Sequence, residues 1–189
     1  MRIVAGSHRG RRLLVPSGAK VRPTSDRARE AMFNIIFHGG VAGGRVPLAD
    51  STVLDAFAGT GALGLEALSR GAAGAVFIER DRDALAILRK NISVLGEDAQ
   101  SRVIVGDATR PPHAVCECAV VFIDPPYRSG LVTPALQALT AAGWFAPQAL
   151  VVVELAAREE FALPEGFTLL DERVYGAARI VFLRCQAEA

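Results

Sequence analysis

Residues 52–64 read T-V-L-D-A-F-A-G-T-G-A-L-G, and this stretch decides the fold. It predicts an apolar strand that carries Asp55 near its end and passes into three glycines, Gly59, Gly61 and Gly64, in a G-x-G-x-x-G pattern. Glycine permits a tight turn and a close approach of the backbone to a ligand. Between a strand and a helix, this pattern is typical of a nucleotide-binding crossover, although alone it is a weak signal.

The chain on the C-terminal side of this stretch continues as alternating strands and helices. Predicted strands cover residues 52–57, 75–79, 102–106, 119–124 and 149–154, and predicted helices cover residues 62–70, 83–95 and 134–142. Continuous apolar strands that alternate with helices indicate an α/β fold, with a parallel sheet covered on both faces. Residues 167–184 predict a terminal hairpin that turns at Gly176.

The chain on the N-terminal side is basic, and we expect residues 1–45 to form a small extension to a main domain of residues 46–189. Two short strands around a glycine-bounded turn are predicted near its start, followed by a helix from Thr24 or Ser25. Residues 1–30 hold eight Lys or Arg against two acids, a charge of +6, and the whole chain has only +1, so the remainder carries −5. This asymmetry indicates a surface for a polyanion; a solvated basic arm without a partner is the alternative.

The composition excludes several classes of protein. With 189 residues, 51% of them hydrophobic and 22% charged, the chain suits one soluble globular domain with a small appendage. It has no apolar run of the roughly 18 residues that a membrane span needs and no signal-peptide pattern, so we expect a cytoplasmic protein without a membrane partner. Its three cysteines and three histidines lack ligand spacing, so no metal site is expected.

Acidic residues fall at the ends of four predicted strands: Asp55, Glu79, Asp107 and Asp124. Ligands of such sheets bind outside the carboxyl ends of the strands, and Glu79, twenty residues after Gly59, is placed to accept both hydroxyls of a ribose. Two ligands fit: a dinucleotide or S-adenosylmethionine. Asp55 favours the second, because a negative charge does not help a pyrophosphate but attracts a cation. Asp107 is placed to accept from an adenine amino group; a turn or helix-cap role is the alternative.

The fourth strand runs into D-P-P-Y at residues 124–127. Proline cannot donate to a sheet, so the strand ends there. Asp124 and the carbonyl of Pro125 provide two fixed acceptors, which would stabilise the charge that develops on the amino group of a base during methyl transfer. Tyr127 provides a face on which the base can stack. A plain turn is the alternative interpretation.

These motifs together resemble a known family. D-A-F-A-G-T-G, F-I-E-R-D, G-D-A and D-P-P-Y, in that order, resemble the class I, S-adenosylmethionine-dependent amino-methyltransferases. R-I-V-A-G-S-H-R-G-R-R-L and R-P-T-S-D-R-A-R-E-A-M-F-N, with G-A-L-G-L-E-A-L-S-R-G-A, are similar to the bacterial methyltransferases that modify guanine N2 in 16S ribosomal RNA. The resemblance covers nearly the whole chain. It implies a Rossmann-like sheet of seven strands, mostly parallel with the last strand antiparallel.

The resemblance also implies roles for individual residues. S-adenosylmethionine, which leaves as S-adenosylhomocysteine, would contact Asp55, Phe57, Gly59, Gly61, Glu79, Arg80, Asp107 and Ala108. The target guanine would meet Asp124, Pro125, Pro126 and Tyr127. Family members often have Phe in place of Tyr127, and either ring can stack, so we expect Tyr127→Phe to be nearly silent because stacking does not need the hydroxyl. The partner would be 16S ribosomal RNA in a small-subunit assembly particle, held by Arg9, Arg11, Arg12, Lys20, Arg22, Arg27 and Arg128.

Two other functions stay open on the residues alone. D-P-P-Y also occurs in DNA adenine-N6 and cytosine-N4 amino-methyltransferases, although this chain lacks an obvious target-recognition insertion. A non-catalytic nucleic-acid-binding module with a vestigial cofactor site is the other alternative. Methyl transfer to defined RNA or DNA would distinguish the three.

Overall fold

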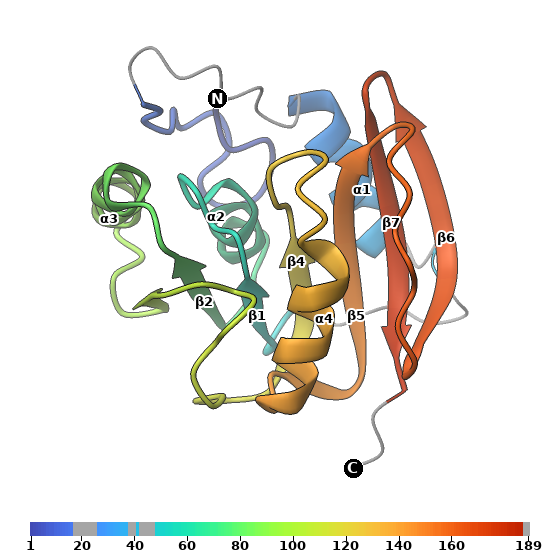
Figure 1. The fold of residues 1–189 in the computed structure, drawn as a ribbon. Helices are drawn as coiled ribbons and strands as arrows, with labels where there is room; N and C mark the ends of the chain where they lie inside the picture. Colours follow the sequence, from blue (N-terminus) through green and yellow to red (C-terminus); the bar gives the residue numbers. More distant parts are fainter. Residues whose placement is uncertain (17–25, 38–40, 42–47, 187–189) are drawn as a thin grey trace.

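The computed structural model describes residues 1–16, 26–37, 41 and 48–186 of the protein. The strands are β1 (Thr52–Asp55), β2 (Gly74–Glu79), β3 (Ser101–Val105), β4 (Cys118–Ile123), β5 (Phe145–Ala156), β6 (Phe167–Tyr175) and β7 (Ala178–Cys185). They form one seven-stranded sheet in the order β3-β2-β1-β4-β5-β7-β6, drawn in Figure 1. The first five strands of this order pair in parallel, and β7 is antiparallel to both neighbours. The predicted α/β fold with a reversed last strand is therefore confirmed.

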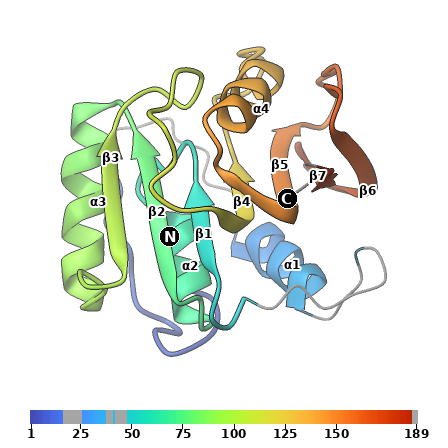
Figure 2. The same cartoon turned by 90° about the horizontal axis from the view of Figure 1, so that it is seen from below.

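Helices cover both faces of the sheet. They are α1 (Asp26–Phe37), α2 (Ala62–Ser69), α3 (Arg82–Leu95) and α4 (Val132–Ala141). Apolar residues of α1, α2 and α3 share a core with one set of strand side chains, and α4 packs in a second core with the alternate set. Figure 2 shows α4 on the opposite side of the sheet from α1 and α2. Within the described residues, no helix combines the length and the apolar composition that a membrane crossing requires.

The alternation along the strands explains these two cores. Val53 and Phe122 face the core of α1 to α3, whereas their sequence neighbours Leu54 and Val121 face the core of α4. Strands buried on both faces read as continuous apolar runs, which is why the sequence predicted them well. The main difference is the length of β5, which extends beyond the predicted strand 149–154 at both ends. It begins at Phe145, which pairs with Cys118 of β4, and it continues to Ala156, because β7 pairs with it as far as that residue.

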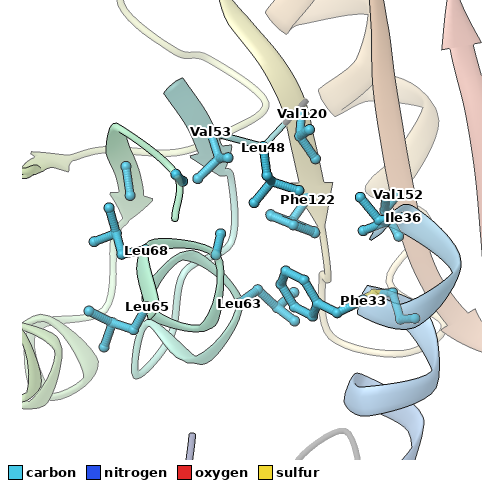
Figure 3. Packing of buried hydrophobic residues seen from close by; sticks show 14 of the residues in the cluster. Phe33, Ile36, Leu48, Val53, Leu63, Leu65, Leu68, Val120, Phe122 and Val152 are labelled. Carbon is cyan, nitrogen blue, oxygen red and sulfur yellow. The ribbon is translucent and has the colours of Figure 1, made fainter. Parts of the chain in front are cut away.

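Helix α1 belongs to the same core as the sheet. Met32, Phe33 and Ile36 are at most 2% exposed. The ring centroids of Phe33 and Phe122 lie 5.4 Å apart at an interplanar angle of 42°, and Figure 3 shows both rings beside Leu63 of α2. The predicted beginning of this helix at Thr24 or Ser25 lies outside the described residues.

The first 16 residues, called the N-terminal segment below, are anchored to α2. Their predicted hairpin is reduced to one antiparallel bridge between Arg2 and Arg12. The carboxylate of Glu66, which is fully buried, accepts hydrogen bonds from the backbone N–H of Val4 at 2.8 Å and of Ala5 at 3.1 Å. The proposed boundary at residue 45 remains a prediction, but the N-terminal segment packs directly on the main domain.

A close approach of two backbones fixes this anchoring. A Cβ added at Gly6 would lie 1.7 Å from the carbonyl oxygen of Ser69, so only glycine fits there. Ser69 also accepts from the N–H of Ser7 at 2.8 Å, and its hydroxyl accepts from the N–H of His8 at 3.0 Å. The path of the N-terminal segment over α2 is therefore set by specific contacts.

Candidate active site

A cavity of about 660 Å³ opens at the carboxyl ends of the parallel strands. It lies where the strand order turns back, since β2 and β4 flank β1 on its two sides, and ligands of such sheets bind at this point. Its volume is typical of a small-molecule site. Eleven of the twelve predicted cofactor and base residues line it: Asp55, Phe57, Gly59, Glu79, Arg80, Asp107, Ala108, Asp124, Pro125, Pro126 and Tyr127.

Gly61, the twelfth residue, is the N-cap of α2 rather than part of the cavity wall. Its φ of 83° is left-handed, and a Cβ there would lie 2.4 Å from Cδ1 of Leu88, so the position favours glycine. Asp55 completes this helix start, because its Oδ2 accepts from the N–H of Gly64 at 3.0 Å. The turn after β1 therefore places the Asp55 carboxylate between the first turn of α2 and the cavity.

Asp55 is buried, and its surroundings change its acidity. It is 1% exposed. Burial raises its pKa to about 7, the hydrogen bond from Gly64 opposes this rise, and the charge of Glu79 adds to it. A cation in the cavity would offset the cost of ionising this carboxyl.

Glu79 joins the end of β2 to the loop after β1. Its Oε2 accepts from the N–H of Gly59 at 2.7 Å, and its Oε1 accepts from the N–H groups of Arg80 and Asp81 at 2.8 and 2.7 Å. Because these bonds fix the side chain, its carboxylate faces the cavity in a defined orientation. The remaining acceptor positions of such a carboxylate suit the hydroxyls of a ribose.

Asp107 lies in the turn after β3 and lines the cavity. It accepts from the N–H and hydroxyl of Thr109 at 2.9 and 2.8 Å, and from Nη1 of Arg80 at 2.8 Å. The bonds from Thr109, and then Arg80, hold its pKa below the usual value. Asp107 therefore stabilises its own turn, as the alternative interpretation held, and still lines the cavity beside Ala108.

The residues after β4, numbers 124–130, form a segment that we call the acceptor loop. Burial, followed by the charges of Glu154 and Asp55, raises the pKa of Asp124 well above its usual value. Tyr127 is 37% exposed, and its hydroxyl donates to Oε1 of Glu154 at 2.6 Å. The sequence did not predict this contact of the hydroxyl.

Glu154 is a site residue that the sequence analysis missed. It is 4% exposed, lies on β5 next to β4, and lines the cavity with Asp124 and Tyr127. A signal was present, because Glu154 ends the predicted strand 149–154 and is a fifth acid at a strand end. Met1, Pro16 and Arg29 also line the cavity, and no local pattern indicated that these distant residues would reach it.

The predicted RNA-binding residues fall into two groups. Arg9, Arg11, Arg12, Arg27 and Arg128 are exposed, whereas Lys20 and Arg22 lie outside the described residues. Arg29, another cation of the basic region, is buried, with its Nε 3.7 Å from Oε2 of Glu66. In the described part of the chain, no group of three or more His, Cys, Asp or Glu residues could hold a metal ion.

Comparisons with known proteins agree with this geometry. The family described as "Conserved hypothetical protein 95" matches residues 1–184. The chain is 38% identical to ribosomal RNA small subunit methyltransferase D of Escherichia coli, over 100% of this chain and 91% of that protein. It is 35% identical to the Haemophilus influenzae protein of the same name, over 93% of this chain and 89% of that protein. A solved structure of the E. coli protein yhhF, described as a candidate methyltransferase, superposes with a TM-score of 0.81 at 36% identity, covering 100% of this chain and 99% of that one.

These matches run from the N-terminal segment through the last strand, so they include the strand ends that line the cavity and the acceptor loop. Identity at this level over nearly the full length of both chains establishes common membership. The chain belongs to the family of ribosomal RNA small subunit methyltransferase D.

Proposed function

We propose that this protein transfers a methyl group from S-adenosylmethionine to the exocyclic N2 amino group of a guanine in 16S ribosomal RNA. One observation carries this proposal: the acids at the ends of β1, β2 and β3 and the residues of the acceptor loop line the same cavity. A cofactor held by the acids would present its methyl group to a base held by the loop. The names of the relatives support ribosomal RNA of the small subunit as the substrate.

The residues present suit S-adenosylmethionine. Glu79 would accept from the ribose hydroxyls, Asp107 with Ala108 would hold the adenine, and Asp55 would face the cationic methionine end. A Cβ at Gly59 would meet no protein atom within 4 Å, so this backbone borders open space that a ligand can approach. S-adenosylmethionine supplies an electrophilic methyl group on a sulfonium sulfur.

The acceptor loop would prepare the guanine for attack. The lone pair of the N2 amino group is delocalised, and the nitrogen would become tetrahedral and cationic as it takes the methyl group. The bond from this carbon to the sulfonium sulfur would break, S-adenosylhomocysteine would leave, and the nitrogen would then lose one proton to solvent. Asp124 and the carbonyl of Pro125 would accept from its hydrogens and stabilise this charge as it develops. Tyr127 would stack on the base, which has to leave its own stack at a cost of a few kcal/mol.

The exposed arginines would hold the RNA backbone. Arg9, Arg11 and Arg12 project from the N-terminal segment, whose Met1 and Pro16 border the cavity, and Arg128 follows Tyr127 directly. Contacts to phosphates give affinity and register rather than base identity. We also propose that this RNA is methylated in the cytoplasm, within a small-subunit assembly particle.

Single-turnover methyl transfer tests this proposal. Excess enzyme with labelled S-adenosylmethionine should methylate 16S ribosomal RNA in small-subunit particles from a strain that lacks the gene, and should leave duplex DNA unmodified. Asp124→Ala should slow transfer at saturating RNA by about 10²–10³-fold, as for the loss of one preorganised group at a site of developing charge. The transfer rate of Asp124→Asn, which keeps an acceptor oxygen, should lie between the rates of wild type and Asp124→Ala.

Three outcomes would contradict the proposal. Faster methylation of duplex DNA would favour the DNA amino-methyltransferases. RNA and cofactor binding without transfer would indicate a binding module. A wild-type rate in Asp124→Ala would remove the acceptor loop from the chemistry.

A further inference from the structure

Two acidic side chains, at positions 154 and 159, accept hydrogen bonds from adjacent residues of the acceptor loop. Glu154, on β5, accepts from the hydroxyl of Tyr127 at 2.6 Å. Glu159, five residues later, accepts from the backbone N–H of Arg128 at 2.8 Å. One contact fixes the aromatic ring and the other fixes the backbone that follows it.

The backbone at this point needs such support. Arg128 has a φ of 57°, in the left-handed region that residues other than glycine rarely adopt. Residues from Pro126 to Gly130 are exposed, and the turn closes with a 3.2 Å bond from the N–H of Ser129 to the carbonyl of Pro126. An uncommon conformation persists when its surroundings over-determine it, and Glu159 supplies a bond from outside the turn.

Glu159 is itself fixed by the neighbouring strands. Its N–H donates to the carbonyl of Ala156 at 2.9 Å, and its Oε2 also accepts from the N–H of Ala156 at 3.2 Å. The guanidinium of Arg179, on β7, donates to the Glu159 carbonyl. The acid is therefore anchored to the antiparallel pair β5–β7, at the point where the parallel strands meet the C-terminal hairpin.

We propose that Glu154 and Glu159 are positioning residues that act as a clamp, holding the Tyr127 ring and the Arg128 backbone in the orientation that receives the target base. This inference rests on the proposed function, because the clamp matters to catalysis only if a base enters beside Tyr127. The clamp explains why a buried acid lies within residues 149–156 of β5, a buried run that is otherwise apolar. It also connects the C-terminal hairpin to the methyl-transfer site.

The test combines a structural and a catalytic measurement. Hydrogen exchange of the Arg128 amide, followed by NMR, reports the backbone contact without any substrate. Glu159→Ala should raise this exchange rate by about tenfold or more, since it removes the acceptor that protects the amide. Glu160→Ala, at the exposed neighbouring position, is the matched control and should exchange as wild type.

Catalysis should follow the same pattern. Glu159→Ala and Glu154→Ala should each lower the single-turnover rate at saturating RNA by about 10–100-fold, the effect of a small misplacement at a reacting centre, while S-adenosylmethionine affinity stays within about twofold. Glu154→Gln, which keeps an acceptor for the hydroxyl, should recover most of the rate. Tyr127→Phe removes the hydroxyl that donates this bond. Because both substitutions remove the same contact, the double variant Tyr127→Phe with Glu154→Ala should be no slower than the slower of the two single variants.

Two results would overturn the clamp: unchanged exchange of the Arg128 amide in Glu159→Ala, or wild-type rates in both alanine variants. If Glu154→Ala does not fold, Tyr127→Phe and Glu154→Gln decide the same contact, and a wild-type rate in Tyr127→Phe would refute it. A wild-type protein that methylates no RNA would end the proposed function, whereas the exchange measurement would still decide whether Glu159 holds the loop.

Discussion

At the scale of single residues, Asp55 shows how one carboxyl serves both the fold and the ligand. It caps the beginning of α2 through the N–H of Gly64, yet it is buried at the wall of the cavity. Burial favours the protonated form, and a cationic ligand favours the ionised form. The residue therefore links protonation to both stability and cofactor binding.

Stability without cofactor should fall as the pH rises. The folded-state pKa of Asp55 is raised from 3.8 to about 7, so the folded protein binds this proton more tightly than the unfolded chain. The associated stability is complete below about pH 4 and is lost as the pH rises to 7, by up to about 4 kcal/mol. Asp124, whose pKa is raised too, contributes with the same sign.

Urea unfolding between pH 4 and 8 measures this effect. Asp55→Asn keeps an oxygen for the Gly64 N–H and has no proton to lose, so its stability should depend less on pH. Identical pH profiles for the variant and the wild type would show that Asp55 titrates normally.

Glu79 provides a second prediction at this scale. Its three backbone contacts mean that Glu79→Ala would disturb the loop as well as the ligand site, so Glu79→Gln is the better variant. We expect Glu79→Gln to weaken S-adenosylmethionine binding by roughly 1–3 kcal/mol, the range for a hydrogen bond to a charged group. Calorimetry measures the affinity, with Asp83→Asn, an exposed acid of α3, as the control. Equal affinities for Glu79→Gln and wild type would exclude Glu79 from the cofactor site.

At the scale of elements, the N-terminal segment is both part of the core and a basic surface. Ile3 and Leu13 are at most 5% exposed, and the buried Glu66 depends on N–H groups of this segment. Deleting residues 1–22, a simple test of RNA binding on sequence grounds, would therefore expose the core and leave a buried carboxylate without these donors. Substituting its exposed arginines is a sharper experiment.

Changing Arg9, Arg11 and Arg12 together to Ala should weaken RNA binding without affecting cofactor affinity. All three are exposed, so the fold should be preserved. The slope of log affinity against log salt should become shallower by about 0.7–0.9 for each arginine that contacts a phosphate. Filter binding at several salt concentrations measures the slope. Arg102 on β3 and Arg173 on β6, both exposed, are the control substitutions, and an unchanged slope in the triple variant would leave this surface as solvated charge.

At the scale of the whole molecule, the sequence predicts what lies along continuous strands. The meeting of Asp55, Glu79, Asp107 and Asp124 at one cavity follows from a parallel sheet, because its strand ends share one edge. The same rule applies to Glu154, which lies at the end of the fifth predicted strand. It was missed in the sequence analysis because its neighbours in that strand are apolar.

Other features needed the structure. The contacts from the N-terminal segment to α2 join residues more than 60 positions apart, and no periodicity encodes such a pair. Glu159 lies in the chain beyond β5, and its role depends on a left-handed φ at Arg128 that the sequence does not indicate. Long-range polar contacts of this kind depend on tertiary packing, which local patterns do not specify.

The identity of the methylated nucleoside tests the central claim most directly. Small-subunit particles from a strain that lacks the gene would be treated with the protein and labelled S-adenosylmethionine, and their ribosomal RNA would be digested to nucleosides and analysed by mass spectrometry. We expect the label in N2-methylguanosine, and far less of it after the same short reaction with Asp124→Ala. Label in N6-methyladenosine or N4-methylcytidine, or on guanine at an atom other than N2, would contradict the assignment of the acceptor loop to the guanine amino group.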